Sequence, residues 1–249
     1  MYDIGIIGGM GPKATAMLFD KMVNFTDANS DQEHPSIIIL DNTEIPDRTH
    51  YILTQEGTSP LEGIDEALNI FSALIKPNGT IGIACNTAHY FSDSIDNTSK
   101  LYGFNFINMP EYTLKHVSLS NLSKKCCILC TQGTKAARIY NKANPGGLEI
   151  LYPTDKQCEE VQSIIYQIKD TSNIDYREIA LQLSDLMKRI GDYTFVLACT
   201  ELSILDKSLL RQTSLVDAMD ILSMMLVNKS GHHIRVVDKS YDEKIIRMM

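Results

Sequence analysis

The sequence predicts an α/β protein made of two similar lobes, each with its own parallel sheet. Three observations lead to this fold. Short runs rich in β-branched residues alternate with amphipathic segments, which is the pattern of βαβ units. The pattern restarts near residue 126. Finally, each half contains an apolar strand that ends in Ala-Cys, at Cys85 and at Cys199, and is followed by a hydroxyl-bearing residue.

The composition is that of an ordinary globular protein. Of 249 residues, 44% are hydrophobic and 22% are charged, which suffices for one large or two small cores. No apolar run approaches the roughly 18 residues that a membrane helix needs, and residues 1–8 lack the basic region of a signal peptide. The six cysteines show no secreted disulfide spacing, so we expect them to be reduced. The protein is therefore expected to be cytoplasmic, with no membrane association.

The charge balance narrows the class of partner. The chain has 23 Lys and Arg against 31 Asp and Glu, a formal net charge of −8, and the acidic residues are spread along the chain. This sign disfavours nucleic acid and anionic membranes as partners. An anionic small molecule would have to be bound by a few local cations and backbone N–H groups.

The elements of the first half follow from apolar periodicity. A strand at 3–8 ends at the glycine turn Gly8-Gly9-Met10-Gly11-Pro12, and a helix follows with Pro12 in its first turn. Apolar residues at helical spacing from Ile64 to Ile75 predict a second helix that ends before Pro77. The remaining predicted strands are 37–40, 80–84 and 104–109, with a helix opened by Pro110 after the last.

The second half repeats this plan. A strand at 126–130 meets the turn Thr131-Gln132-Gly133-Thr134 and a helix, as the first strand meets its glycine turn. Further elements are helices at about 156–170 and 175–190, strands at 195–198 and 215–217, and a helix near 218–228.

The two strand-end cysteines carry the most specific chemistry. Ligands of open parallel sheets bind at the carboxyl ends of the strands. A cysteine that opens a helix there directs its sulfur at unpaired backbone N–H groups, which favours the thiolate. Two thiols facing each other across a cleft could remove a proton from one face of a carbon and return one to the other. The alternative is that both are simply buried residues.

Other motifs have competing interpretations. His89, four residues after Cys85, could form a Cys–His dyad for hydrolysis. The glycine turn lacks the third glycine of a dinucleotide fingerprint, so it is better interpreted as a nest for a smaller anion. Cys127 and Cys130 have C-x-x-C spacing, but in a strand they face opposite sides, which disfavours redox pairing or zinc binding.

Arg48 lies in Ile45-Pro46-Asp47-Arg48-Thr49, just beyond the carboxyl end of the strand at 37–40. A guanidinium there could bind a carboxylate through two parallel hydrogen bonds. Alternatively, Arg48 is an exposed loop residue paired with Asp47.

Taken together, the motifs resemble those of the cofactor-independent aspartate/glutamate racemases, with the aspartate racemases nearest. The similarity runs in order from residue 4 to about 226. The motifs that carry it are Gly5–Pro12, Asp31-Gln32-Glu33-His34-Pro35, Ile45–Thr49, Cys85-Asn86-Thr87-Ala88-His89, Thr131–Thr134 and Cys199-Thr200-Glu201.

The resemblance implies two flavodoxin-like lobes related by a pseudo-two-fold axis, a cleft between them, and a homodimer. We expect residues 1–110 with about 205–228 to form the lobe of Cys85, and 111–204 to form the lobe of Cys199. Residues 229–249 would be a C-terminal extension, with 241–249 as a poorly ordered tail. Neither a cofactor nor a metal ion is expected.

The resemblance also assigns roles. Cys85 and Cys199 match the paired catalytic cysteines, and Arg48 matches the arginine that binds the side-chain carboxylate. Lys169 is the candidate for an assisting lysine. The other implied substrate-binding residues are Asn86, Thr87, Thr131, Thr134, Thr200 and Glu201.

The leading hypothesis is a racemase that interconverts L- and D-aspartate without pyridoxal phosphate, by a two-base mechanism. Glutamate, broad-specificity amino-acid or hydantoin racemisation is the alternative within the same superfamily. A non-catalytic amino-acid-binding protein and a Cys–His amidohydrolase are alternatives from other classes.

Overall fold

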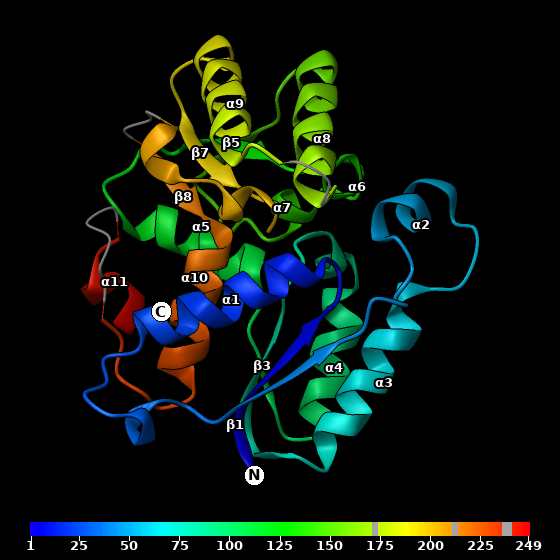
Figure 1. Cartoon of the computed structure of the whole chain (residues 1–249), viewed down its shortest axis with the longest axis vertical. Coiled ribbons are helices and arrows are strands. Elements are labelled where there is room, and N and C mark those ends of the chain that lie inside the picture. The colour runs from blue at the N-terminus through cyan, green and yellow to red at the C-terminus, as the bar shows by residue number, and fades with distance from the viewer. Residues whose placement is uncertain (171–173, 211–213, 236–240) are drawn as a thin grey trace.

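Two parallel sheets, each of four strands, organise the part of the chain described by the computed structural model, residues 1–170, 174–210, 214–235 and 241–249 (Figure 1). The strand order is β2-β1-β3-β4 in the first sheet and β6-β5-β7-β8 in the second. Numbered from the start of its own half, each sheet therefore has the same order. This repetition confirms the expected pair of flavodoxin-like lobes.

The strands lie close to their predicted positions. In the first sheet they are β1 (Tyr2–Gly8), β2 (Ile37–Asp41), β3 (Ile75–Ile83) and β4 (Asn105–Phe106). In the second they are β5 (Lys125–Leu129), β6 (Glu149–Leu151), β7 (Thr194–Leu197) and β8 (Leu215–Asp217). Of these strands, only β6 has no counterpart among the predictions.

The helices form three layers around the two sheets. Helices α3 (Pro60–Ser72) and α4 (Ser92–Leu101) cover the outer face of the first sheet, and α8 (Asp155–Lys169) and α9 (Tyr176–Ile190) cover that of the second (Figure 1). Between the sheets lie α1 (Pro12–Phe25), α5 (Met109–Leu119) and α10 (Ala218–Lys229). The shorter helices are α2 (Arg48–Thr54), α6 (Gln132–Ala136), α7 (Ile139–Lys142) and α11 (Glu243–Met248).

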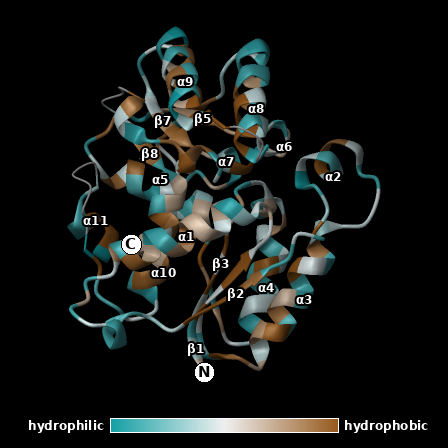
Figure 2. Ribbon diagram, viewed as in Figure 1, coloured by the Kyte–Doolittle hydropathy of each residue, from teal (hydrophilic) through white to brown (hydrophobic). Residues whose placement is uncertain are grey.

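The largest hydrophobic core is shared by the two lobes. It joins one face of each sheet, whose strands are mostly hydrophobic (Figure 2), through α10, in which every residue from Ala218 to Val227 is buried. Successive side chains of a strand point to opposite faces of the sheet. Cys126 and Ile128 of β5 therefore point into the shared core, while Cys127 and Leu129 point to the outer core under α8 and α9. Cys130 lies on the side of Cys126, so Cys127 and Cys130 do face opposite sides, as predicted.

One predicted boundary is wrong. Helix α3 ends at Ser72, and Ile75, the last residue of the predicted helical stripe, begins β3 and pairs with Tyr2 of β1. Ile75 is buried in the same core as Phe71, so the apolar spacing continues although the backbone has changed from helix to strand. Spacing alone cannot distinguish these two states for a residue at the junction.

The C-terminal region differs from the expectation in two respects. Strand β8, within the segment 205–228 assigned to the first lobe, pairs with β7 in the second sheet, while the adjoining α10 packs against α1 and α5. Residues 241–249 are not a disordered tail. They form α11, with Tyr241, Ile246 and Met249 buried against the shared core, because the apolar residues of α11 cover one side of α10.

Within the described ranges, no helix combines the length and the hydropathy required to cross a membrane.

The burial of the C-terminal helix is testable by truncating one side chain. Ile246 is fully buried, so Ile246→Ala should lower the free energy of unfolding by about 2–5 kcal/mol, measured by urea denaturation. Met248 is 76% exposed in the same helix, and Met248→Ala is the matched control with an effect near zero. Equal effects of the two substitutions would contradict the packing of α11.

Candidate active site

The two cysteines occupy equivalent positions at the ends of central strands. The N–H of Ala84 donates to the carbonyl of Ile7 on β1 (3.0 Å), and the N–H of Ala198 donates to the carbonyl of Leu129 on β5 (2.8 Å). Each alanine is the last residue before its cysteine. These equivalent hydrogen bonds place Cys85 of the first lobe and Cys199 of the second at matching strand ends, next to the same pocket.

Both thiols line one small pocket between the lobes. Cys85 is 6% exposed and Cys199 is 4% exposed. The volume of the pocket is about 10 Å³, room for roughly one water molecule. All the predicted site residues except Thr134 line it. The complete lining is Met10, Asp47, Arg48, Thr49, Cys85, Asn86, Thr87, Thr131, Lys169, Cys199, Thr200 and Glu201.

The cysteines do not open α-helices, contrary to the prediction. Cys85 precedes a 3₁₀ turn at Thr87–Phe91, and Cys199 precedes another at Leu202–Ile204. Such short turns supply little of the dipole that would favour a thiolate.

Glu201 holds the proton on Cys199. The Cys199 thiol donates to Glu201 Oε2 (2.9 Å). Burial, followed by the nearby negative charge of Glu201, raises the pKa of Cys199 well above its ordinary value. Cys199 is therefore a thiol in the structure, and Glu201 is the group to which its proton could pass.

Lys169 approaches the same carboxylate from the mouth of the pocket. Its Nζ lies 3.6 Å from Glu201 Oε1, and about a third of its side chain is exposed. Burial opposes the charge, but the negative charge of Glu201, followed by that of Cys199 and Cys85 in their thiolate forms, outweighs it and raises the pKa of Lys169. The ammonium therefore stays charged beside both cysteines.

Arg48 is buried and fixed by backbone carbonyls. Nη1 donates to the carbonyls of Ile45 (3.1 Å) and Pro46 (2.9 Å), and Nη2 donates to that of Met10 (2.8 Å). A guanidinium has five N–H groups, so these bonds leave two for a ligand. One is on Nε, which has no hydrogen-bond partner among the described residues.

The alternative of an exposed loop arginine is wrong. Arg48 is 8% exposed, and Asp47 instead caps α2 by accepting from the N–H of His50 (2.6 Å). The cap fixes the first turn of α2 and with it the direction of the Arg48 side chain. Because both N–H groups of Nη1 and one of Nη2 are already used, a carboxylate could bind only to the remaining two N–H groups of Arg48.

The glycine turn places the carbonyl that Arg48 uses. Gly9 has a φ of +85°, and a Cβ there would lie 2.2 Å from the backbone of Asn42, so only glycine fits. Its N–H donates to Thr15 Oγ1 (3.1 Å). This N–H is therefore not available to the anion nest that the sequence predicts.

Three threonine hydroxyls join the lobes behind the pocket. Thr87 Oγ1 lies 2.9 Å from Thr131 Oγ1 and 3.0 Å from Thr134 Oγ1, and Thr131 donates to Thr134 (3.1 Å). Thr134 is fully buried and acts behind Thr87 and Thr131. A second link runs from the hydroxyl of Thr200 to the carbonyl of Ala84 (3.3 Å).

Asn86 has one partner that the sequence does not reveal. The hydroxyl of Tyr140 donates to Asn86 Oδ1 (2.6 Å), and in the described part of the chain Asn86 Nδ2 has no partner. The amide is thus oriented with its donors free. Tyr140 has no motif around it, whereas Thr49 and Asp47, also not predicted, lie inside the motif of Arg48.

His89 does not form a dyad with Cys85. Its Nδ1 lies 2.9 Å from the carbonyl of Cys85, and its Nε2 accepts from the N–H of Met109 (3.1 Å). Burial lowers its pKa to about 4. With one nitrogen donating and the other accepting, this neutral ring orients the backbone and does not contact the thiol.

Among the described residues, no group of three or more His, Cys, Asp and Glu side chains is arranged to hold a metal ion.

Comparison with known proteins places the chain in a family. The sequence model of the family described as Asp/Glu/Hydantoin racemase matches residues 7–226. The chain belongs to this family. The match includes the elements that carry both cysteines, Arg48 and Lys169, and it supports an amino-acid racemase.

Individual members of the racemase family are similar at different levels. The broad specificity amino-acid racemase RacX of Bacillus subtilis is 23% identical, with 90% of this chain and 96% of that protein covered. The aspartate racemase of Picrophilus torridus is 26% identical, with a TM-score of 0.81 and 98% of both chains covered. The glutamate racemase isoform RacE1 of Bacillus anthracis shares the fold, with a TM-score of 0.58, 14% identity, and coverage of 90% of this chain and 80% of that one.

The contact between Glu201 and Cys199 leads to a prediction for this family member. Glu201→Gln keeps the size of the side chain but removes its negative charge, so the pKa of Cys199 should fall. Alkylation of Cys199 by iodoacetamide, mapped by mass spectrometry across a pH series, should therefore have its midpoint at a lower pH. Cys85 in the same sample is the internal control. An unchanged Cys199 midpoint would show that Glu201 does not hold the proton.

Proposed function

We propose that the protein is a cofactor-independent aspartate racemase that works through two cysteine bases. The observation that carries this proposal is the convergence of Cys85 and Cys199, from equivalent strand ends of the two lobes, on one buried pocket. A single nucleophilic cysteine would need no partner from the other lobe. A non-catalytic binding protein would need neither thiol.

The proposed reaction moves two protons and no other atoms. The thiolate of one cysteine takes the α-proton of aspartate and becomes a thiol, leaving the electron pair on Cα. The thiol of the other cysteine then donates its proton to the opposite face and becomes a thiolate. The amino acid is inverted, and the two cysteines have exchanged protonation states.

Glu201 fits the role of proton acceptor for Cys199 in this scheme. Because Cys199 is a thiol hydrogen-bonded to Glu201, it is ready to donate a proton in one direction of the reaction. In the other direction it must first lose that proton, and Glu201 Oε2 lies at hydrogen-bond distance to take it.

The buried donors match a dicarboxylate. The remaining N–H groups of Arg48 can bind the side-chain carboxylate, and Asn86 Nδ2 can bind the α-carboxylate. Hydrogen bonds to the α-carboxylate would also stabilise the negative charge that develops next to it in the transition state. Lys169 adds a positive charge beside both thiols.

Substrate binding requires the pocket to open. A volume of about 10 Å³ does not hold an amino acid. The wall formed by α2 of the first lobe packs on α6 of the second, where a Cβ at Gly133 would lie 2.8 Å from the Cα of Thr49. We therefore propose that the lobes separate at this contact to admit aspartate, and that closure then excludes water.

A second candidate is racemisation of several amino acids. The similarity to the broad specificity racemase RacX favours it, and the structural similarity extends to glutamate racemases. The homodimer that the family resemblance implies is part of our proposal, to be tested by the mass of the protein in solution.

The two-base proposal predicts the effect of removing either thiol. Wild-type protein incubated with L-aspartate in D₂O should yield D-aspartate with deuterium at Cα. Cys85→Ser and Cys199→Ser should each abolish racemisation, because a serine hydroxyl is far too weak an acid to be deprotonated here. Each variant should still exchange deuterium into one enantiomer through the surviving thiol. Racemisation by either variant at the wild-type rate would exclude the mechanism.

Arg48 should determine the preference for aspartate. A buried, charge-assisted pair is worth about 1.5–3 kcal/mol, so Arg48→Ala should lower kcat/KM for aspartate by about 10- to 150-fold. Arg48→Lys should restore it only partly, since the ammonium lacks the planar guanidinium geometry.

Alanine, which has no side-chain carboxylate, is the control substrate for this variant. Loss of the three carbonyl bonds of Arg48 would lower turnover of aspartate and alanine alike, whereas loss of carboxylate binding lowers only the former. Wild-type turnover of glutamate equal to that of aspartate would instead favour the broad-specificity candidate.

A further inference from the structure

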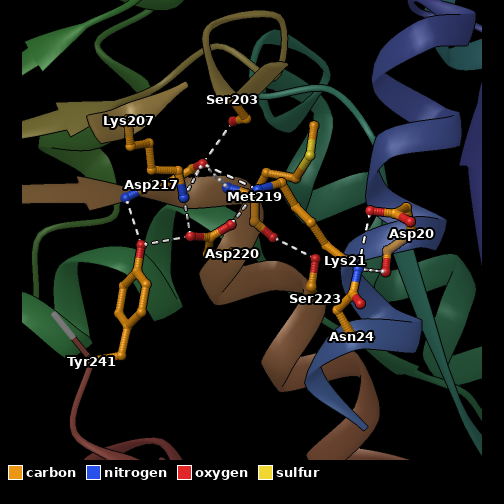
Figure 3. A network of polar contacts seen from close by, with 10 residues as sticks. All are labelled: Asp20, Lys21, Asn24, Ser203, Lys207, Asp217, Met219, Asp220, Ser223 and Tyr241. Atoms are coloured by element: carbon orange, nitrogen blue, oxygen red, sulfur yellow. Dashed lines mark hydrogen bonds and ion pairs between the residues drawn. The ribbon is translucent and has the colours of Figure 1, made fainter. Parts of the chain in front are cut away.

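A buried network of charges lies next to the Cys199 segment but outside the pocket. Asp217 and Asp220, at the start of α10, have side chains 0% and 2% exposed. Figure 3 shows Lys21, Lys207, Ser203 and Tyr241 converging on these two carboxylates from different parts of the chain. None of these residues lines the pocket of the cysteines.

Two ammonium groups form ion pairs with both carboxylates. Lys207 Nζ lies 2.9 Å from Asp217 and also contacts Asp220, and Lys21 Nζ lies 2.6 Å from Asp220 and 3.7 Å from Asp217. Burial opposes the ionisation of Asp217, but the charges of Lys207 and Lys21 outweigh it and hold its pKa at about 2. Asp217 is therefore a fixed negative charge at any physiological pH.

Asp217 is bonded directly to the turn that follows Cys199. The hydroxyl of Ser203 donates to Asp217 Oδ1 (2.6 Å). Ser203 is in the middle of the 3₁₀ turn Leu202–Ile204, whose first residue donates its N–H to the carbonyl of Cys199 (3.0 Å). The backbone of Cys199 and Glu201 is thus connected to Asp217 through one side-chain hydrogen bond.

Two further contacts fix Asp217 itself. Lys21 belongs to α1 of the first lobe, so its ion pairs join that lobe to the start of α10. Tyr241 belongs to the C-terminal segment: its oxygen accepts from the N–H of Asp217 (3.1 Å), and its hydroxyl donates to Asp220 (3.0 Å). The position of Asp217 therefore depends on both lobes and on the C-terminal segment.

We propose that Ser203 and Asp217, braced by Lys207 and Tyr241, form a positioning site that holds Cys199 and Glu201 in register with Cys85. This inference rests on the proposed two-base function. The turn after Cys85 is anchored differently: its hydroxyls bond to the threonines of the other lobe and to the backbone of the turn itself, and His89 bonds to the carbonyl of Cys85 and the N–H of Met109. None of these contacts involves Ser203 or Asp217. Loss of the anchor should therefore disturb one cysteine and spare the other.

Ser203→Ala is the decisive variant. It removes one hydroxyl, while Asp217 Oδ1 keeps its bond from the N–H of Met219 (2.9 Å) and Oδ2 keeps both ammonium groups. Ser223→Ala is the matched control. Ser223 is also buried and lies in α10, one turn after Met219, but its hydroxyl bonds only to the carbonyl of Met219 (2.7 Å) among the described residues.

The first readout is catalytic. Displacement of a reacting group by about 1 Å can cost on the order of 100-fold, so we expect Ser203→Ala to lower kcat for racemisation by roughly 10-fold or more with KM nearly unchanged. Deuterium exchange from D₂O should slow for one enantiomer only, the one whose α-proton Cys199 removes. Ser223→Ala should change neither rate.

The second readout does not need racemase activity. With the turn loosened, water reaches the Cys199 thiol and its bond to Glu201 weakens. The pH midpoint for alkylation of Cys199 should then shift to lower pH in Ser203→Ala, while that of Cys85 stays in place. If wild-type protein racemises no amino acid, the proposed function fails but this comparison still tests the positioning site.

Two results would overturn the inference. One is a Ser203→Ala protein that matches Ser223→Ala in both readouts. The other is an equal effect on both cysteines, which would indicate general loosening of the fold. Should Ser203→Ala fail to fold, Tyr241→Phe provides the test, because it removes the brace on Asp217 and leaves the turn intact. It should shift the Cys199 midpoint in the same direction by a smaller amount, and an unmoved midpoint would contradict the proposal.

Discussion

The candidate site depends on three buried polar atoms that have no hydrogen-bond partner among the described residues, one of which, Glu201 Oε1, has only an ion pair with Lys169 at 3.6 Å. Arg48 Nε, Asn86 Nδ2 and Glu201 Oε1 are buried, and the described part of the chain offers none of them a hydrogen bond. Each such atom costs about 1–3 kcal/mol, so the three side chains have to be held by their other atoms. Backbone carbonyls hold Arg48, the hydroxyl of Tyr140 holds Asn86, and the thiol of Cys199 holds Glu201. A ligand that supplies the missing partners recovers this free energy without any reorganisation of the side chains.

The two lobes are held together by an extensive apolar core and, near the pocket, by much weaker polar contacts. The shared core under α10 is extensive and apolar, and separating it would expose many side chains to water. Next to the pocket, by contrast, the lobes are joined by individual hydrogen bonds, from Thr87 to Thr131 and Thr134, from Thr200 to Ala84 and from Tyr140 to Asn86, and by the packing of the short helix α2 on α6. Each hydrogen bond contributes only about 0.5–1.5 kcal/mol. The opening that we propose for substrate entry would therefore be confined to the contacts around the pocket, while the shared core keeps the lobes together.

The sequence predicted the parts of this arrangement that depend on local pattern. Parallel strands bring their carboxyl ends to one edge, so the Ala-Cys strand ends at Cys85 and Cys199 were sufficient to locate the site. Tyr140 and Tyr241 could not be predicted, because each acts through a contact with residues distant in sequence and neither belongs to a motif. The predicted C-terminal end of the helix at Ile75 is wrong because apolar spacing reports burial and not backbone conformation: Ile75 is buried with Phe71 but belongs to β3. Whether Arg48 is buried could not be predicted, since the same motif is compatible with an exposed or a buried side chain.

The two cysteines are not chemically equivalent, although the strands that carry them are. Cys199 is hydrogen-bonded to a carboxylate that keeps it protonated, whereas the corresponding position two residues after Cys85 is Thr87, a neutral hydroxyl. In a two-base reaction one thiol must be protonated and the other ionised at the start, and each turnover exchanges the two states. Returning to the starting state then requires a proton to move between the cysteines while the pocket is free. Glu201, bonded to one thiol and paired with Lys169, whose charge acts on both, is placed to receive and return that proton. On the proposed mechanism, the asymmetry of the site lies in this carboxylate, and the charged network behind Ser203 keeps it beside Cys199.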